Sequence, residues 1–156
     1  MRELGDFLAA LGAEYSPADQ RININDRRFA ASPEVSAWIC DRSRLIYAGK
    51  LLGRARGGFQ PSAILLRELA TLPQVKRLWV DERVGWLFAC GRDVFKESVQ
   101  RIDGTFVEGA YFLIMLGEDC IGYGRVEPQD GRLILANLFD IGDFLRREKP
   151  AVPSVR

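Results

Sequence analysis

The chain has 156 residues, 47% hydrophobic and 28% charged, which is enough for one ordinary domain or two small ones with modest cores. It contains no histidine, so catalysis and metal binding that depend on an imidazole are excluded, and its three cysteines lack the close spacing of a metal or redox motif. The net charge of +1 gives no global attraction to nucleic acid, so only a local basic patch can provide one.

The chain begins with alternating helical and extended patterns. Apolar residues recur at the spacing of one helix face, and Gly12 follows them as a stop: Leu4, Phe7, Leu8 and Leu11. Alternation over 21–25, a turn at Asp26 and an apolar run over 28–31 predict a hairpin. Ser32 as the cap and Pro33 at the first helical position then predict a helix that runs to about Cys40.

Two extended segments are expected next, over 45–53 and 57–61, and a helix over 63–72 is expected to pack on them. Strands that follow one another this closely predict an antiparallel sheet. Because a proline and a polar residue separate a helix from a strand at Pro73-Gln74, we place a domain boundary there and expect an N-terminal α/β domain over 1–74.

The second half predicts a strand over 76–80, a helix over 82–90 with Val84, Leu87 and Phe88 on one face, and a strand over 92–95. Further strands are expected over 105–107, 111–116, 120–127 and 133–137, with a turn or short helix over 140–147. This order predicts a small barrel over 75–149, followed by a flexible tail over 150–156.

Two motifs of the second half carry a resemblance to a known domain. They are the run Gly91-Arg92-Asp93-Val94-Phe95-Lys96-Glu97-Ser98-Val99 and the hairpin Ile121-Gly122-Tyr123-Gly124. With these motifs and its order of strand, helix, strand and hairpins, the second half resembles the PUA domain. That domain is the RNA-binding pseudobarrel of pseudouridine synthases and archaeosine transglycosylases.

The whole chain resembles the NIP-seven-type ribosome-biogenesis proteins of archaea and eukaryotes, on segments 45–54, 78–80 and 140–148. The resemblance implies an α+β fold: a small N-terminal α/β domain with an antiparallel sheet, followed by a C-terminal PUA pseudobarrel. The chain departs from the family at Phe59-Gln60-Pro61-Ser62, where the family usually has a basic stretch leading to an arginine and histidine pair. That departure puts in doubt any role of the first domain through those residues.

The resemblance implies a non-enzymatic factor that acts on precursor rRNA of the large ribosomal subunit, with the PUA domain binding RNA and the first domain binding other assembly proteins. Two alternatives stay open: a protein-binding module with a degenerate barrel, which the near-neutral charge of both halves supports, and an accessory subunit of an RNA-modifying enzyme. We expect no catalytic residue, metal, cofactor or small-molecule substrate. We also expect no membrane contact, because the longest apolar runs are far shorter than a membrane helix. The family is cytoplasmic in archaea and largely nucleolar in eukaryotes, and the excess of arginine over lysine favours an archaeal, cytoplasmic protein.

The candidate RNA-binding residues fall in two places. Gly91 stands at a helix-to-strand junction, where a missing side chain permits positive φ and lets an RNA backbone approach; a plain helix stop is the alternative. Arg92 and Lys96 flank this junction. Arg146, Arg147 and Lys149 form a cationic end where the family's RNA surface is implied to lie, although a solvated terminus has the same composition.

A second basic cluster is a candidate for partner or RNA binding, or for a solvated strand surface: Arg42, Arg44, Lys50, Arg54 and Arg56. Among the aromatic residues, Trp79 and Trp86 are expected in the core because their neighbours are apolar. Tyr123, between two glycines, is expected to be the most exposed ring and thus the best placed to stack on an unpaired base. The thiols are expected to be reduced and buried.

Overall fold

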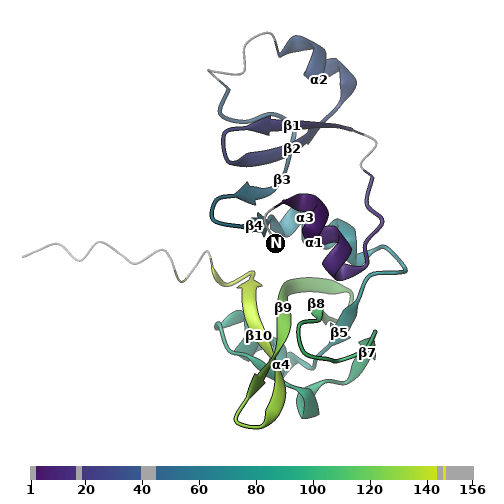
Figure 1. Cartoon of the computed structure of the whole chain (residues 1–156), viewed down its shortest axis with the longest axis vertical. Helices are drawn as coiled ribbons and strands as arrows, with labels where there is room; N and C mark the ends of the chain where they lie inside the picture. The colour runs from purple at the N-terminus through teal and green to yellow at the C-terminus, as the bar shows by residue number, and fades with distance from the viewer. Residues whose placement is uncertain (1–2, 17–18, 40–44, 144–145, 147–156) are drawn as a thin grey trace, which may run out of the picture.

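The computed structural model describes residues 3–16, 19–39, 45–143 and 146, and it arranges them around two sheets with α1 and α3 between them (Figure 1). The first sheet has the order β1-β2-β3-β4 and is antiparallel throughout. The elements of this half are α1 (Leu4–Leu11), β1 (Gln20–Ile24), β2 (Arg27–Ala31), α2 (Pro33–Trp38), β3 (Lys50–Ala55), β4 (Phe59–Pro61) and α3 (Ala63–Ala70). The predicted antiparallel sheet is confirmed.

Local signals explain where the helices of the first half begin and end. All four apolar residues predicted for α1 are buried, and Gly12 ends the helix at φ 72°, a left-handed conformation that suits glycine. The Ser32 hydroxyl accepts from the Val35 amide and so caps α2, which ends at Trp38 with no buried residue among its members. The helix is therefore shorter than predicted, and Cys40 lies outside the described residues. The extended segment predicted from Leu45 becomes a strand only at Lys50.

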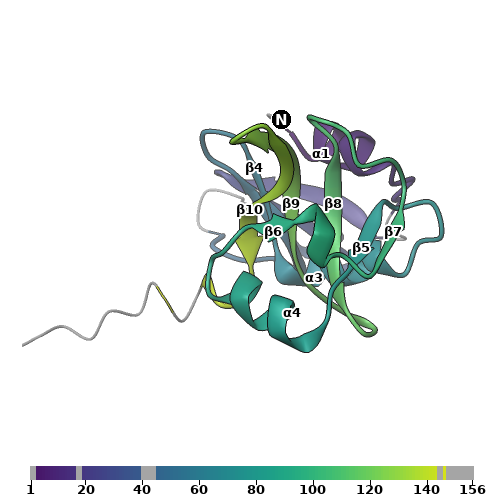
Figure 2. The ribbon, with the colours of Figure 1, turned by 90° about the horizontal axis from the view of Figure 1, so that it is seen from below.

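The second half forms a six-stranded sheet of order β6-β10-β9-β8-β5-β7, in which only β5 and β8 run parallel. Its elements are β5 (Arg77–Trp79), α4 (Glu82–Ala89), β6 (Val94–Phe95), the short 3-10 helix η2 (Lys96–Ser98), β7 (Arg101–Asp103), β8 (Tyr111–Leu116), β9 (Asp119–Gln129) and β10 (Arg132–Asp140). The sheet curls, and α4 packs against β8, β9 and β10 (Figure 2).

The ladders on both sides of β9 are irregular near Gly122. Gly122 lies opposite Ile114 of β8 and Asp140 of β10, and both ladders shift register beside it. Its φ of 155° and the absence of a side chain let the Phe139 carbonyl pass where a Cβ would stand 2.1 Å away. A β-bulge of this kind bends a strand and increases its twist, which closes the sheet toward a half-barrel.

One predicted strand is wrong. Residues 105–107 lie in a loop, and the strand of this region is β7, four residues earlier, which pairs with β5. Gly104 turns the chain away at φ 128°, and Phe106 then packs against Phe112 with ring centroids 5.9 Å apart. Phe106, the apolar residue that suggested a strand, is thus buried although it lies in a loop.

A single core joins the two halves. Phe7 of α1 contacts the Tyr123 ring edge-on at 5.2 Å and the Phe59 ring at 5.6 Å, and Leu113 and Met115 of β8 belong to the same buried cluster. The domain limits near residue 74 remain a prediction, because this packing crosses them. Among the described residues, no helix has the length and apolar character of a membrane span.

Candidate nucleic-acid interface

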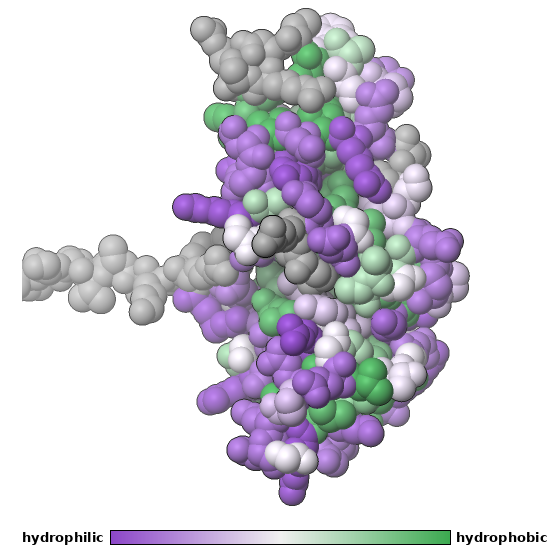
Figure 3. Space-filling view, viewed as in Figure 1, coloured by the Kyte–Doolittle hydropathy of each residue, from purple (hydrophilic) through white to green (hydrophobic). Residues whose placement is uncertain are grey.

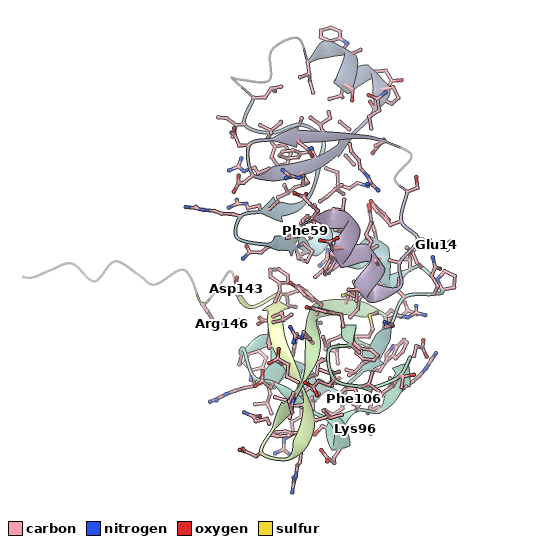
Figure 4. The ribbon with its side chains drawn as sticks, viewed as in Figure 1. Glu14, Phe59, Lys96, Phe106, Asp143 and Arg146 are labelled. Carbon is pink, nitrogen blue, oxygen red and sulfur yellow. The ribbon has the colours of Figure 1, made fainter. Side chains whose placement is uncertain are left out.

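The α4-to-β6 junction combines two of the predicted sites. Gly91 has φ 86°, as predicted for a glycine there, and its amide closes α4 by donating to the Phe88 carbonyl. A Cβ on Gly91 would lie 3.3 Å from the guanidinium carbon of Arg146. The Arg146 guanidinium therefore packs beside Gly91, which itself remains exposed, and Arg146 lies near Asp143 (Figure 4).

Arg146 belongs to a polar cluster around the buried Asp140, which we call the Asp140 cluster: Asn137, Asp140, Gly142 and Arg146. The Asp140 carboxylate is 1% exposed and accepts both guanidinium Nη groups of Arg146, at 2.9 and 2.7 Å. It also accepts from the Asn137 amide at 3.0 Å and the Gly142 backbone at 2.9 Å. The hydrogen bond to Asp140 raises the pKa of Arg146 above its ordinary value. Much of the charge of Arg146 is thus compensated within the protein.

The cluster ties the end of β10 to the end of α4. Arg146 donates to the Ala89 carbonyl, and the Asn137 amide donates to the Phe88 carbonyl at 2.8 Å. The Asn137 backbone amide in turn donates to the Asp93 carboxylate at 2.8 Å. Hydrogen bonds from Asn137 and Arg146 therefore hold the junction at which the sequence predicts an RNA contact.

The other predicted RNA-binding residues do not all meet at this junction. Arg92 is exposed beside it and makes no ion pair with another described residue. Lys96 lies over the Phe106 ring, 5.8 Å from its centroid, in a different part of the barrel from Arg146 (Figure 4). Arg147 and Lys149 lie outside the described residues. The structure thus groups Gly91, Arg92 and Arg146 and separates Lys96 from them.

The basic cluster of the first half contains both paired and unpaired cations. The Lys50 ammonium lies 2.5 Å from Glu68, which also accepts from the Tyr15 hydroxyl at 2.6 Å. Arg54 and Arg56 are exposed, without an ion pair to any residue in the part of the chain that the structure describes. Arg42 and Arg44 lie outside that part.

Lys50 therefore stabilises the fold in a pH-dependent way. Burial raises the pKa of Glu68, but the hydrogen bonds from Lys50 and Tyr15 outweigh it and leave the pKa below its ordinary value. A lowered folded pKa gives stability that is present above the unfolded value of about 4.3 and is lost as pH falls through the folded pKa. We expect Lys50→Met to lower the urea midpoint at pH 7, and the difference from wild type to shrink below about pH 4. An equal difference at both pH values would contradict this role.

Several side chains differ from prediction in their exposure. Tyr123 was expected to be exposed but is 5% exposed, packed between Phe7 and Phe139, and its burial raises its pKa to about 12. Trp86 was expected in the core but is 71% exposed, because α4 turns Gly85 and Phe88 inward. Leu87, expected on the same face as Phe88, is 45% exposed for the same reason. The sequence signal that was missed is Gly85, which lets Leu116 approach the helix closely.

The two remaining comparisons concern Trp79 and the thiols. Trp79 is half-buried, with its indole donating to the Gly117 carbonyl at 3.2 Å and the Arg101 guanidinium 4.2 Å from its ring centroid. Cys120 is buried, which raises its pKa to about 11, whereas Cys90 is exposed, contrary to prediction. Within the described ranges, no three Cys, Asp or Glu side chains group as a metal site requires.

A cleft between the two halves is the main feature that the sequence did not predict. Its volume is about 780 Å³. One wall comes from β3, β4 and the start of α3, and the other from the end of β10 and the residues after it, including the Asp140 cluster. Gly91 also lines it, so the predicted junction opens onto this cleft.

A second exposed feature lies at the far end of the first half. Four large apolar side chains are exposed there, Val35 at 43%, Trp38 at 86%, Ile46 at 74% and Tyr47 at 55%, and we call them the distal patch. A hollow of about 450 Å³ lies among Val35, Trp38 and Tyr47. Figure 3 shows apolar residues near this upper end and hydrophilic residues over much of the remaining face.

Comparison with known proteins identifies relatives of both halves. A model of the UPF0113 PUA domain matches residues 76–149. A UPF0113 protein of Aeropyrum pernix is 31% identical over 150 residues, covering 90% of this chain and 84% of the relative. A UPF0113 protein of Archaeoglobus fulgidus is 32% identical over 116 residues, and the match covers 66% of this chain and only 63% of the relative's length.

A solved structure shares the fold. It is described as a conserved PUA domain protein from Thermoplasma acidophilum, with a TM-score of 0.56 and 17% identity over 91% of this chain and 89% of that chain. The predicted fold class is confirmed: a mixed α and β chain with an antiparallel sheet and a curled, PUA-type half-barrel sheet.

Proposed function

Because this chain belongs to the UPF0113 PUA-domain family, we propose that it is a non-enzymatic RNA-binding factor of the NIP-seven type that acts on precursor rRNA of the large ribosomal subunit. PUA domains generally bind RNA, and the observation that carries the proposal is the hydrogen-bonded, glycine-bearing α4-to-β6 junction beside the exposed Arg92. Division of labour between residues 1–74 and 75–149 is part of the proposal, with RNA held by the second half.

The candidate RNA-binding cations of the second half have different roles in this proposal. Arg146 shapes the RNA surface through its bonds to Asp140 and Ala89, while Arg92, Arg147 and Lys149 contact phosphates. Lys96, which lies over Phe106, is a secondary contact at most. Phosphate contacts of this kind release condensed counterions, so affinity depends on salt.

The distal patch supports the protein-binding role of the first half. Exposed apolar patches rimmed by polar residues mark interaction sites, and four large side chains gather here on a part of the molecule remote from the RNA junction. We assign to it an apolar segment of another ribosome-assembly protein. Lys50, which the sequence offers as a candidate for partner binding, is paired with Glu68.

Salt-dependent RNA binding tests the proposal. The full chain should bind a U-rich or ribosomal RNA oligonucleotide, with log affinity falling linearly with log salt. For single strands the slope is about −0.7 per neutralised phosphate, so the triple variant Arg92→Ala/Arg147→Ala/Lys149→Ala should lose about 2 units of slope. The variant leaves Arg146 and the Asp140 cluster intact.

Fluorescence anisotropy from 50 to 300 mM salt provides the measurement, and circular dichroism confirms that the variant is folded. Binding by the triple variant as tight as wild type would remove these residues from the site. Absence of RNA binding by wild type at low salt would instead favour the protein-binding module with a degenerate barrel.

A further inference from the structure

The cleft between the two halves contains unpaired positive charge on one wall. Arg54 of β3 and Arg67 of α3 both line it, both are exposed, and neither makes an ion pair within the described ranges. Other arginines of the chain are engaged by carboxylates, among them Arg28, Arg77, Arg101 and Arg125. A guanidinium presents a planar fork of donors that matches a phosphate, so these two side chains suit a phosphate-bearing ligand.

The opposite wall carries two carboxylates and one guanidinium. Asp140 and Asp143 lie 2.7 and 3.9 Å from Arg146, and these three groups form one ion cluster. These three charges sum to −1, and Arg54 and Arg67 on the first wall bring the sum over the described lining residues to +1. An anionic ligand is therefore favoured over a cationic one.

The same wall is partly apolar. Leu138 and Ile141 are 45% and 47% exposed, and the half-buried Phe139 ring stacks on Tyr123 with centroids 6.5 Å apart. Gln60 of β4, directly opposite Arg54 in the ladder, is exposed and adds an amide with donor and acceptor groups. Apolar surface on one wall, facing cations and an amide on the other, matches a nucleotide, which has a flat base at one end and a phosphate at the other.

Aromatic packing joins the two walls. Phe7 bridges Phe59, beneath the first wall, and Tyr123, which lies in the second, with ring centroids 5.6 and 5.2 Å apart. The volume of about 780 Å³ lies within the range of about 300–1,000 Å³ seen for small-ligand sites. A preformed cavity of this size needs little reorganisation on binding.

We propose that this cleft binds one nucleotide of a single-stranded RNA segment, with Arg54 and Arg67 on its phosphates and Phe139, Leu138 and Gln60 around its base. This deepens the proposed function and rests on it: the RNA path continues from the Gly91 junction, which lines the same cleft, onto the first half. The first half then contributes RNA affinity as well as protein binding.

The test is RNA binding by the full chain carrying Arg54→Ala/Arg67→Ala. The matched control is Arg83→Ala/Arg132→Ala, which removes the same charge from exposed positions outside the cleft. At about 150 mM salt we expect the cleft variant to bind a single-stranded oligonucleotide about tenfold more weakly, with a log–log salt slope reduced by about 1.4. The control variant should keep the wild-type slope.

Equal affinities and slopes for the two variants would overturn the cleft assignment while wild-type RNA binding, and with it the proposed function, stands. Loss of RNA binding by wild type would defeat both. A 4-thiouridine-labelled RNA should crosslink to peptides containing Gln60 and Phe139; crosslinks confined to residues 76–149 would also overturn the assignment. Uridine monophosphate tests the other source of this chemistry: if the cleft variant loses saturable binding of the monophosphate but keeps wild-type affinity for the oligonucleotide, the cleft is a free-nucleotide site and the strand proposal is overturned.

Discussion

Replacing Asp140 with alanine is expected to lower the free energy of unfolding by about 3 kcal/mol, because its buried carboxylate accepts four hydrogen bonds and bonds to a charged group contribute about 1.5–3 kcal/mol each. The change removes the acceptor of both Arg146 Nη groups and also deprives the Asn137 side chain and the Gly142 amide of a partner. Chemical denaturation followed by intrinsic tryptophan fluorescence measures the loss. The ends of β10 and α4 should separate first.

Glu127→Ala is the control for that change. Glu127 forms an ion pair with Arg125 at 3.6 Å, and both side chains are more than 40% exposed, at 41% and 44%. Exposed pairs contribute about 0–1 kcal/mol, so this variant should remain close to wild type. An Asp140→Ala variant as stable as Glu127→Ala would show that the cluster does not hold the barrel together.

Gly122→Ala is expected to be at least as disruptive, with a loss of about 4 kcal/mol. A Cβ there would stand 2.1 Å from the Phe139 carbonyl and 2.7 Å from the Phe88 ring, and the φ of 155° is unfavourable for alanine. Neither neighbour yields easily, because one is backbone in a strand ladder and the other is a fully buried side chain. Denaturation measured at 25 °C, and recovery of soluble protein, report the effect.

The Gly131→Ala variant separates the steric clash from the backbone conformation. Gly131 has φ 76° in the turn between β9 and β10, and no atom lies within 4 Å of its would-be Cβ. Alanine there should cost only about 1 kcal/mol, the penalty of a left-handed conformation. If the two glycine variants lose equal stability, the close packing inferred at the curl of β9 is incorrect.

Much of the fold could be predicted because its signals are local. Gly12 and Ser32 act on neighbouring backbone groups, so their roles as helix stop and cap follow from sequence alone, and the structure confirms both. Exposure could not be predicted in this way. Tyr123 and Trp86 both have apolar neighbours in sequence, but the packing of α1 buries the first, and the inward face of α4 leaves the second in solvent.

The candidate site was predictable only in part. A glycine with positive φ after α4 follows from local sequence, and Gly91 has that conformation. The Asp140 to Arg146 bond needs a buried aspartate, and nothing in the sequence distinguishes Asp140 from Asp143 in that respect. The cleft depends on how the two halves pack together, so no short-range pattern connects Arg54 and Arg67 with Phe139.

The core that joins the halves has a consequence for synthesis of the chain. α1 is made first, whereas Leu113, Met115 and Tyr123, against which it packs, come more than a hundred residues later. Contacts so distant in sequence close slowly, and domains emerge from the ribosome from the N-terminus onward. The part of the α1 apolar face that packs on β8 and β9 therefore stays unburied until those strands are translated, although β4 is already available to cover the rest. Nascent chains halted before residue 111 should be much more prone to aggregation than chains released after β10.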